Sequence, residues 1–272
     1  MKLGYQTNTW GGVVGHPAGV TSVKDLYYLA NGSTAEAVRD IAAAGYQGFE
    51  LFDGNLVAYE GRQDALHALM QETGLALVGV YSGANFIYPD ILADELWRIE
   101  HAARLAAEFG AAHLVVGGGG VRASGVRDAD YDRLADGLEQ VVALAQKYGL
   151  TPNYHPHLGT IVETPEQLAR VMPKTSIYLC PDTGHVDAAG GQSAALVREY
   201  GDRIRYIHLK DYQGGNFLPL GEGQVDFPAI LDALAAHQFN GWITVELDSY
   251  AGAPKEPAIR SREYLEGRIG KR

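Results

Sequence analysis

Short apolar runs alternate along the chain with longer stretches whose apolar residues recur at helical spacing. The short runs are typical of buried β-strands and the longer stretches of amphipathic helices. The pattern predicts eight strands, at Leu3–Thr9, Tyr46–Phe52, Leu75–Tyr81, His113–Gly117, Thr151–His157, Ser176–Asp182, Arg203–Lys210 and Trp242–Leu247. It predicts helices between them, most clearly at Ala35–Ala44, Asp64–Glu72, Leu92–Phe109, Tyr131–Tyr148 and Pro228–His237.

Capping signals mark several helix ends. Ser33 with Glu36, and Thr164 with Gln167, fit the capping box, in which two side chains satisfy free backbone N–H groups at a helix start. Asp226 predicts a further start. Glycines that close helical stretches predict left-handed caps at Gly45, Gly74, Gly110, Gly149, Gly201 and Gly241.

A strand followed by a helix, repeated along the chain, is typical of parallel strands joined by helical crossovers. We therefore predict a single α/β domain, a (β/α)8 TIM barrel over residues 1–272, a length usual for this fold. A doubly wound open sheet is the alternative, but the Gly-x-Gly-x-x-Gly turn of such sheets is missing after the first strand. The run Gly117–Gly120 lacks the Lys-Ser/Thr of a phosphate loop, although its backbone amides could bind an anion.

Composition and charge narrow the expected partners. Hydrophobic residues make up 46% of the chain and charged residues 20%, which is enough for a large core. The 33 acidic and 22 basic residues give a net charge of -11, which repels nucleic acid and anionic lipid. The start of the chain lacks a signal-peptide pattern, and the single cysteine, Cys180, excludes an intrachain disulfide and a thiolate zinc site. We expect a cytoplasmic protein with a small-molecule substrate, and neither nucleic acid nor a membrane as its partner.

Polar residues gather where the predicted strands end. In a TIM barrel these carboxyl ends form one rim, which carries the active site. Residues two apart on a strand share a face, so His155 and His157 are expected to point together, as are His208 and Lys210. The polar residues at the strand ends are Glu50, His155, His157, Asp182, His185, His208, Lys210 and Glu246. Burying so many polar groups at one rim is costly unless they are paired or bind a ligand.

Two imidazoles and two carboxylates of this set are suited to a divalent metal ion. The ligand candidates are His155, Asp182, His208 and Glu246, and such donors favour manganese, cobalt, iron or zinc over magnesium. The other histidines lie in predicted loops, helices or a strand start, and we expect structural or solvated roles for His16, His67, His101, His113 and His237.

Ordinary structural roles are also open to these side chains. Asp182 could cap the turn that follows it, and Glu246 could pair with a basic residue. Glu50 could orient a neighbouring group, and Lys210 could neutralise Asp211. The coincidence of donors at four adjacent strand ends favours the metal site over these separate explanations.

Several stretches around the candidate residues carry a family resemblance: Tyr154–Thr160, Val162–Thr164, Cys180–His185, Ile207–Asp211, Leu220–Phe227 and Gly241–Asp248. In these stretches the chain resembles the xylose isomerase-like TIM-barrel superfamily of sugar isomerases, epimerases and dehydratases. It looks most like the inosose (2-keto-myo-inositol) dehydratases within that superfamily. The resemblance is clear from about Leu150 to Asp248 and looser before Leu150.

The resemblance implies a divalent ion, with Mn2+ expected and Co2+, Fe2+, Zn2+ or Mg2+ as alternatives. The family holds it with a Glu/Asp/His/Glu set at the ends of strands five to eight, and Asp182, His208 and Glu246 match three of these positions. His155 stands where many members have Glu, and the dehydratase-like members share this His-x-His pattern. The pattern leaves open whether His155 or His157 contacts the metal.

The resemblance further implies a keto-sugar, keto-inositol or other polyol substrate, from which an α-proton is removed to form a metal-stabilised enediolate. Loss of the β-hydroxyl as water would then complete a dehydration. The catalytic candidates are His157 as acid/base, Glu50 and His185 as alternative bases, and Lys210 to stabilise negative charge. The loop Trp10–Gly32 is expected to cover the site and to set specificity.

Other outcomes share the same first step. Returning the proton elsewhere gives an isomerase or epimerase, and a glycosidic leaving group gives a 3-keto-glycoside lyase of the C-glycoside deglycosidase type. A non-catalytic, carbohydrate-binding partner subunit on the same scaffold is a further alternative. The family resemblance is compatible with a homo-oligomer or with a complex that includes a small partner subunit.

Overall fold

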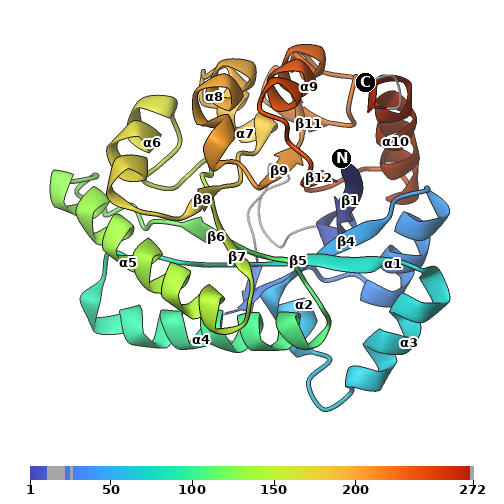
Figure 1. Cartoon of the computed structure of the whole chain (residues 1–272), viewed down its shortest axis with the longest axis horizontal. Coiled ribbons are helices and arrows are strands. Elements are labelled where there is room, and N and C mark those ends of the chain that lie inside the picture. The colour runs from blue at the N-terminus through green and yellow to red at the C-terminus, as the bar shows by residue number, and fades with distance from the viewer. Residues whose placement is uncertain (11–21, 25–26, 270–272) are drawn as a thin grey trace.

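The computed structural model describes residues 1–10, 22–24 and 27–269, and a barrel of eight parallel strands dominates it (Figure 1). Along the sheet the strands follow the order β8-β7-β6-β5-β4-β1-β12-β9. Parallel bridges from Leu179 to Ile204 and from Asp182 to His208 join the two edges of this sheet. The strands span Lys2–Gln6 (β1), Gly48–Phe52 (β4), Ala76–Ala84 (β5), His113–Gly118 (β6), Thr151–His155 (β7), Tyr178–Leu179 (β8), Tyr206–Leu209 (β9) and Trp242–Val245 (β12). The predicted (β/α)8 barrel is confirmed.

Helices form a layer outside the strands (Figure 1). A large apolar cluster fills the space between the two layers, and a smaller one, which includes Phe52, Val115 and Tyr206, lies inside the barrel. The helices span Thr34–Ala43 (α1), Asp53–Val57 (α2), Gln63–Thr73 (α3), Pro89–Glu108 (α4), Asp128–Lys147 (α5), Pro165–Val171 (α6), Thr183–Ala188 (α7), Ser193–Tyr200 (α8), Phe227–Ala236 (α9) and Lys255–Ile269 (α10). None of the helices in the described part of the chain is long and apolar enough to cross a membrane.

Two antiparallel hairpins that the sequence pattern does not predict flank the barrel. One joins Ser22–Lys24 (β2) to Tyr27–Leu29 (β3), and the other joins Asp211–Gln213 (β10) to Asn216–Leu218 (β11), directly after β9. The first hairpin belongs to the loop Trp10–Gly32, whose expected role as a cover falls largely on residues 11–21 and 25–26, outside the described residues.

Five strands, β1, β7, β8, β9 and β12, end earlier than predicted, and three of them do so for clear local reasons. β7 stops at His155 because Pro156 has no N–H with which to continue the ladder, and β8 ends before Pro181 for the same reason. β1 stops at Gln6, whose side-chain oxygen accepts a hydrogen bond from the Asn8 amide at 2.7 Å and starts a 3-10 turn. His157 therefore lies beyond the strand, so strand alternation alone does not set its direction, but its ring still lies near that of His155, with centroids 5.9 Å apart.

The helix caps agree with the sequence at most positions. The Ser33, Thr164 and Asp226 side chains all accept backbone hydrogen bonds at helix starts, and Gly45, Gly74, Gly110 and Gly149 have φ angles from 70° to 87°. The left-handed caps predicted at Gly201 and Gly241 are wrong, since Gly201 has a φ of -53° and Gly241 does not lie in the left-handed region. At both positions a Cβ would collide, 2.2 Å from the His237 ring and 2.4 Å from the Arg205 carbonyl oxygen, so close approach explains these glycines.

Candidate metal centre

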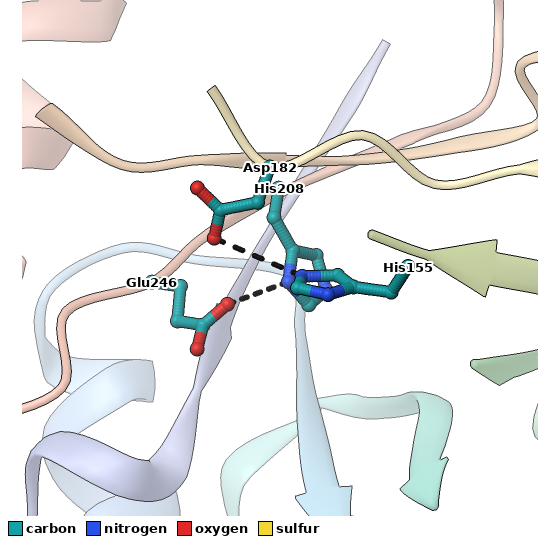
Figure 2. A group of neighbouring side chains, drawn as sticks. All are labelled: His155, Asp182, His208 and Glu246. Carbon is teal, nitrogen blue, oxygen red and sulfur yellow. Dashed lines mark hydrogen bonds and ion pairs between the residues drawn. The ribbon is translucent and has the colours of Figure 1, made fainter. Parts of the chain in front are cut away.

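Four polar side chains from neighbouring strand ends converge inside the rim of the barrel. His155 ends β7, Asp182 lies between β8 and α7, His208 lies in β9, and Glu246 follows β12. One nitrogen or oxygen from each side chain lies within 4.8 Å of the corresponding atom of every other. In Figure 2 Asp182 and His208 enter next to each other, Glu246 enters from one side and His155 from the opposite side, and their polar ends meet in the middle.

This cluster is buried and incompletely paired. The exposed fractions of His155, Asp182, His208 and Glu246 are 1%, 0%, 0% and 7%. Within the described part of the chain, neither ring nitrogen of His155 has a hydrogen-bond partner, and Asp182 Oδ2 has ion-pair neighbours but no hydrogen bond. Buried polar atoms without partners are costly, and a cation between imidazole nitrogens and carboxylate oxygens removes that cost. The donor set therefore fits a divalent metal of the manganese-to-zinc series.

The two carboxylate oxygens of Asp182 have different partners. Oδ1 accepts a hydrogen bond from the His185 amide at 3.1 Å and thereby caps α7. Oδ2 faces the cluster, 3.8 Å from His155 Nε2. The capping role and the role in the donor cluster are thus compatible within one side chain.

Glu50 lies behind His208 as seen from the donor cluster. Its carboxylate is 3.3 Å from His208 Nε2, whereas His208 Nδ1 is 2.6 Å from Glu246 Oε2. Burial opposes charge on His208, but Glu50 and Glu246 outweigh it and raise the pKa of this imidazole to about 10. Glu50 holds the ring so that Nδ1 faces the other donors, which is the arrangement of carboxylate-supported histidine ligands.

Lys210 brings a fully buried cation into the same space. Its Nζ lies 3.2 Å from Asp182 Oδ2, 3.3 Å from Glu246 Oε1 and 3.3 Å from Asp248 Oδ1. Burial would lower the pKa of Lys210, but these carboxylates raise it above its ordinary value. The alternative that Lys210 neutralises Asp211 is wrong, because backbone amides between residues 212 and 225 occupy both oxygens of that carboxylate at 2.8–3.1 Å.

His157 and His185 lie together beside the cluster, with ring centroids 3.8 Å apart. His157 Nδ1 is 2.7 Å from the Leu158 carbonyl oxygen, so Nδ1 carries the proton and Nε2 has a free lone pair. Burial, followed by His155 and Lys210, lowers the pKa of His157 to about 4. Burial, His157 and Lys210 likewise hold the pKa of His185 well below its ordinary value. Both rings are neutral at pH 7.

Sequence reasoning missed four residues at this site. Asn8 donates from Nδ2 to Glu246 Oε1 at 3.0 Å and to Asp248 Oδ1 at 3.3 Å, and burial raises the pKa of Asp248 to about 6. The Tyr81 ring lies 5.4 Å from His155, and the Phe217 ring, on the unpredicted hairpin, 5.0 Å from His185. Asp248 had a detectable signal, since it stands two positions after Glu246 and so on the same face of an extended chain.

The histidines expected to play structural roles lie apart from the donor cluster. His113 stacks on Tyr206 at 4.7 Å, and Glu60 and Asp202 pair with His101 and His237. His67 packs on the Phe109 ring, and His16 lies outside the described residues.

Comparison with known proteins extends these observations. A profile described as xylose isomerase-like TIM barrel matches residues 38–268. Inosose dehydratase from Clostridium beijerinckii is 28% identical over 291 residues, covering 93% of this chain and 96% of that protein. The enzyme of the same name from Geobacillus kaustophilus is 28% identical over 268 residues, covering 85% and 86%. A third, from Halalkalibacterium halodurans, is 32% identical over 166 residues, and the match spans 52% of this chain and about half, 55%, of that relative.

Solved structures share the architecture over nearly the whole length. D-Psicose 3-epimerase from Clostridium cellulolyticum H10 superposes with a TM-score of 0.78 at 15% identity, covering 99% of each chain. A probable 3-DHS dehydratase from Bacillus anthracis superposes with a TM-score of 0.77 at 14% identity, covering 98% of this chain and 100% of that one. At such identities the likeness establishes a common fold. Together with the profile match over most of its length, it shows that the chain belongs to the xylose isomerase-like TIM-barrel family.

Proposed function

We propose that this protein is a divalent-metal-dependent dehydratase that eliminates water from a keto-inositol or a related keto-sugar. The observation that carries the proposal is the buried donor cluster at the barrel rim, in which His155 has two unpartnered ring nitrogens. The inosose dehydratases among its sequence relatives support the choice of dehydration over other sugar chemistry.

In this proposal His155, Asp182, His208 and Glu246 hold the ion, and Mn2+ is the expected metal because the donors combine imidazole with carboxylate. A bound divalent ion supplies Lewis-acid stabilisation to the oxygens of a substrate carbonyl and its neighbouring hydroxyl. Glu50 acts as a positioning residue, because it touches His208 Nε2 and keeps Nδ1 directed at the other donors.

We assign the proton transfer to His157. The residue is half-buried, and its Nε2 is free to accept the α-proton because Nδ1–H donates to the Leu158 carbonyl. The same Nε2–H then returns the proton to the β-hydroxyl, which leaves as water with the electrons of its C–O bond. The His185 ring packs against the His157 ring at an angle of 45° and limits its orientation.

Lys210 stabilises the negative charge that develops on the substrate as the α-proton leaves. Its ammonium group is held between the carboxylates of Asp182, Glu246 and Asp248, at 3.2–3.3 Å, and stays charged. Phe217 lies 5.0 Å from Nζ and shields that face from water, which strengthens the electrostatic interaction.

The test is incubation of Mn2+-loaded protein with 2-keto-myo-inositol, following the absorbance of the unsaturated or dione product and the loss of one water by mass spectrometry. We expect product with the loaded wild type and with His67→Ala, an exposed-histidine control outside the rim, and none with His208→Ala. Absence of product from a protein that demonstrably binds metal would contradict the dehydratase assignment. Exchange of the α-proton for solvent deuterium without loss of water would favour an epimerase or isomerase, and failure to retain metal would favour a binding subunit.

A further inference from the structure

We propose that Asp248 is a positioning residue that holds the Lys210 ammonium group in the site when a divalent ion binds to the donor cluster. The inference rests on the proposed function, because it concerns the ion and the lysine that this function uses. The structure shows one buried ammonium group shared by three carboxylates. Two of these carboxylates, Asp182 and Glu246, belong to the donor cluster, and that of Asp248 does not.

The backbone and the stem of Lys210 are fixed in place. The Thr183 hydroxyl donates to the Lys210 carbonyl oxygen at 2.8 Å, and the same oxygen atom of Thr183 accepts from the Lys210 amide at 2.9 Å. Gly184 packs against the stem, since a Cβ at that position would lie 2.8 Å from Lys210 Cγ. The Phe217 ring lies 5.0 Å from Nζ, and the lysine is fully buried. A move of the whole side chain to solvent would break these contacts, so only the ammonium end can change partners.

The three carboxylates share this ammonium group almost equally. Its Nζ lies 3.2 Å from Asp182 Oδ2 and 3.3 Å from both Glu246 Oε1 and Asp248 Oδ1. A divalent ion held by Asp182 and Glu246 draws on their negative charge and weakens their attraction to Lys210. Asp248 keeps its full charge for the lysine. Its Oδ2 is buried and has no hydrogen-bond partner in the described part of the chain, so it can accept a second bond from the ammonium group.

The balance of charge in this buried group also depends on Asp248. Apart from the paired Glu50 and His208, the group contains three carboxylates and one ammonium, which leaves two negative charges in excess. A divalent ion balances these two charges. Without Asp248 the ion and the lysine would together leave one positive charge in excess, and an uncompensated charge in a buried site is costly.

Two simpler roles for Asp248 predict a different outcome from the proposed one. If Asp248 only attracted the ion directly, or only supported the fold of the site, its loss would cost the same metal affinity with or without Lys210. If it holds the lysine beside the ion, its loss costs more metal affinity when the lysine is present. A double-mutant cycle on metal binding separates these cases.

The experiment measures Mn2+ affinity by competition with a chelator, without substrate, for wild type, Asp248→Asn, Lys210→Gln and the double variant. Asp248→Asn keeps the shape and one acceptor oxygen, and Lys210→Gln removes the positive charge but keeps a donor for the carboxylates. Asp53→Asn is the matched control, because Asp53 is also buried but pairs with Arg98 instead of Lys210. Circular dichroism first establishes that each variant is folded.

We expect Asp248→Asn to weaken Mn2+ binding about 100-fold when Lys210 is present and about tenfold or less in the Lys210→Gln background. Asp53→Asn should bind Mn2+ as wild type does. Equal losses in the two backgrounds would overturn the proposal. Should Lys210→Gln fail to fold, a crystal structure of the wild type with Mn2+ decides. An Nζ bonded to Asp248 and released from Asp182 and Glu246 would support the proposal, and any other arrangement would overturn it.

The cycle is independent of turnover, so the two proposals can fail separately. Unequal losses in a protein without dehydratase activity would refute the proposed reaction and leave the role of Asp248 intact. Equal losses in an active dehydratase would do the reverse. A wild-type protein that binds no Mn2+ would overturn both.

Discussion

Replacement of Glu50 separates the two roles that the sequence leaves open for it, catalytic base and positioning residue. Glu50 is fully buried, and its carboxylate lies 3.3 Å from His208 Nε2, on the side of the ring away from Glu246. Glu50→Gln keeps the shape and one acceptor oxygen but removes the charge that makes the imidazole a stronger donor. Glu50→Leu removes the acceptor as well and leaves a buried N–H without a partner.

The expected magnitudes follow from this geometry. Loss of the partner of a metal-bound histidine costs about 10- to 100-fold in metal affinity, which is roughly 1.4–2.8 kcal/mol. We place Glu50→Gln at the lower end, since the hydrogen bond survives, and Glu50→Leu at or beyond the upper end. Turnover at saturating Mn2+ should fall far less than affinity in Glu50→Gln, because the residue does not touch the reacting atoms in our assignment.

The assay is a Mn2+ titration against a competing chelator, paired with turnover at saturating metal. Asp53→Asn is the matched control, because Asp53 is equally buried and lies just beyond Glu50 but bonds to Ser82, Tyr28 and Gly54 instead of His208. A Glu50→Gln variant with wild-type metal affinity and turnover reduced by about 100-fold or more would refute the positioning argument and identify Glu50 as the base.

The remaining predictions concern three histidines. His155→Leu should stabilise the metal-free protein to urea by about 1 kcal/mol, since it removes unpartnered buried nitrogens, while weakening Mn2+ binding; destabilisation would indicate a partner for that ring. His157→Ala should keep its metal, by elemental analysis, but lose about 100-fold or more in kcat, and loss of metal would make it a ligand. Burial lowers the pKa of His113 from 6.5 to about 4, so the unfolded chain takes up the proton first and stability falls by about 3 kcal/mol as the pH drops from 6.5 to 4. His113→Phe, which retains an aromatic ring against Tyr206, should lose this part of the pH dependence of stability. A plot of urea midpoint against pH that is the same in His113→Phe and wild type would contradict this contribution of His113.

The barrel was predictable because its signals are local and repeated. Each strand run is followed by a helical stretch, and caps such as Ser33 and Asp226 mark helix starts within a few residues. The strand ends were less predictable, since Gln6 stops β1 through a side-chain hydrogen bond that no pattern announces. The reason for Gly201 was also not predictable from local sequence, because it is the close approach of the His237 ring, 36 positions further along the chain.

The part of the candidate site that lies at strand ends was predictable from the sequence. Asp182, His208 and Glu246 follow from their places at strand ends, because parallel neighbours bring such residues together. Asn8 and Phe217 could not be found in that way, since Asn8 lies in a 3-10 turn and Phe217 in a short hairpin that the sequence pattern does not predict. The left-handed backbone of Phe86, with a φ of 61°, could not be predicted either, because its amide is held by a hydrogen bond to Glu95 that only the tertiary structure sets.

Asp182 connects the capping hydrogen bond of α7 to the presence of an ion at the donor cluster. Because one oxygen caps the helix while its twin faces the donors, a cation that draws the carboxylate inward must stretch or tighten the bond to the His185 amide. Deuterium exchange at that single amide should therefore report whether an ion is present, even in a catalytically silent variant. Exchange at the start of α7 would thus measure metal occupancy without any substrate.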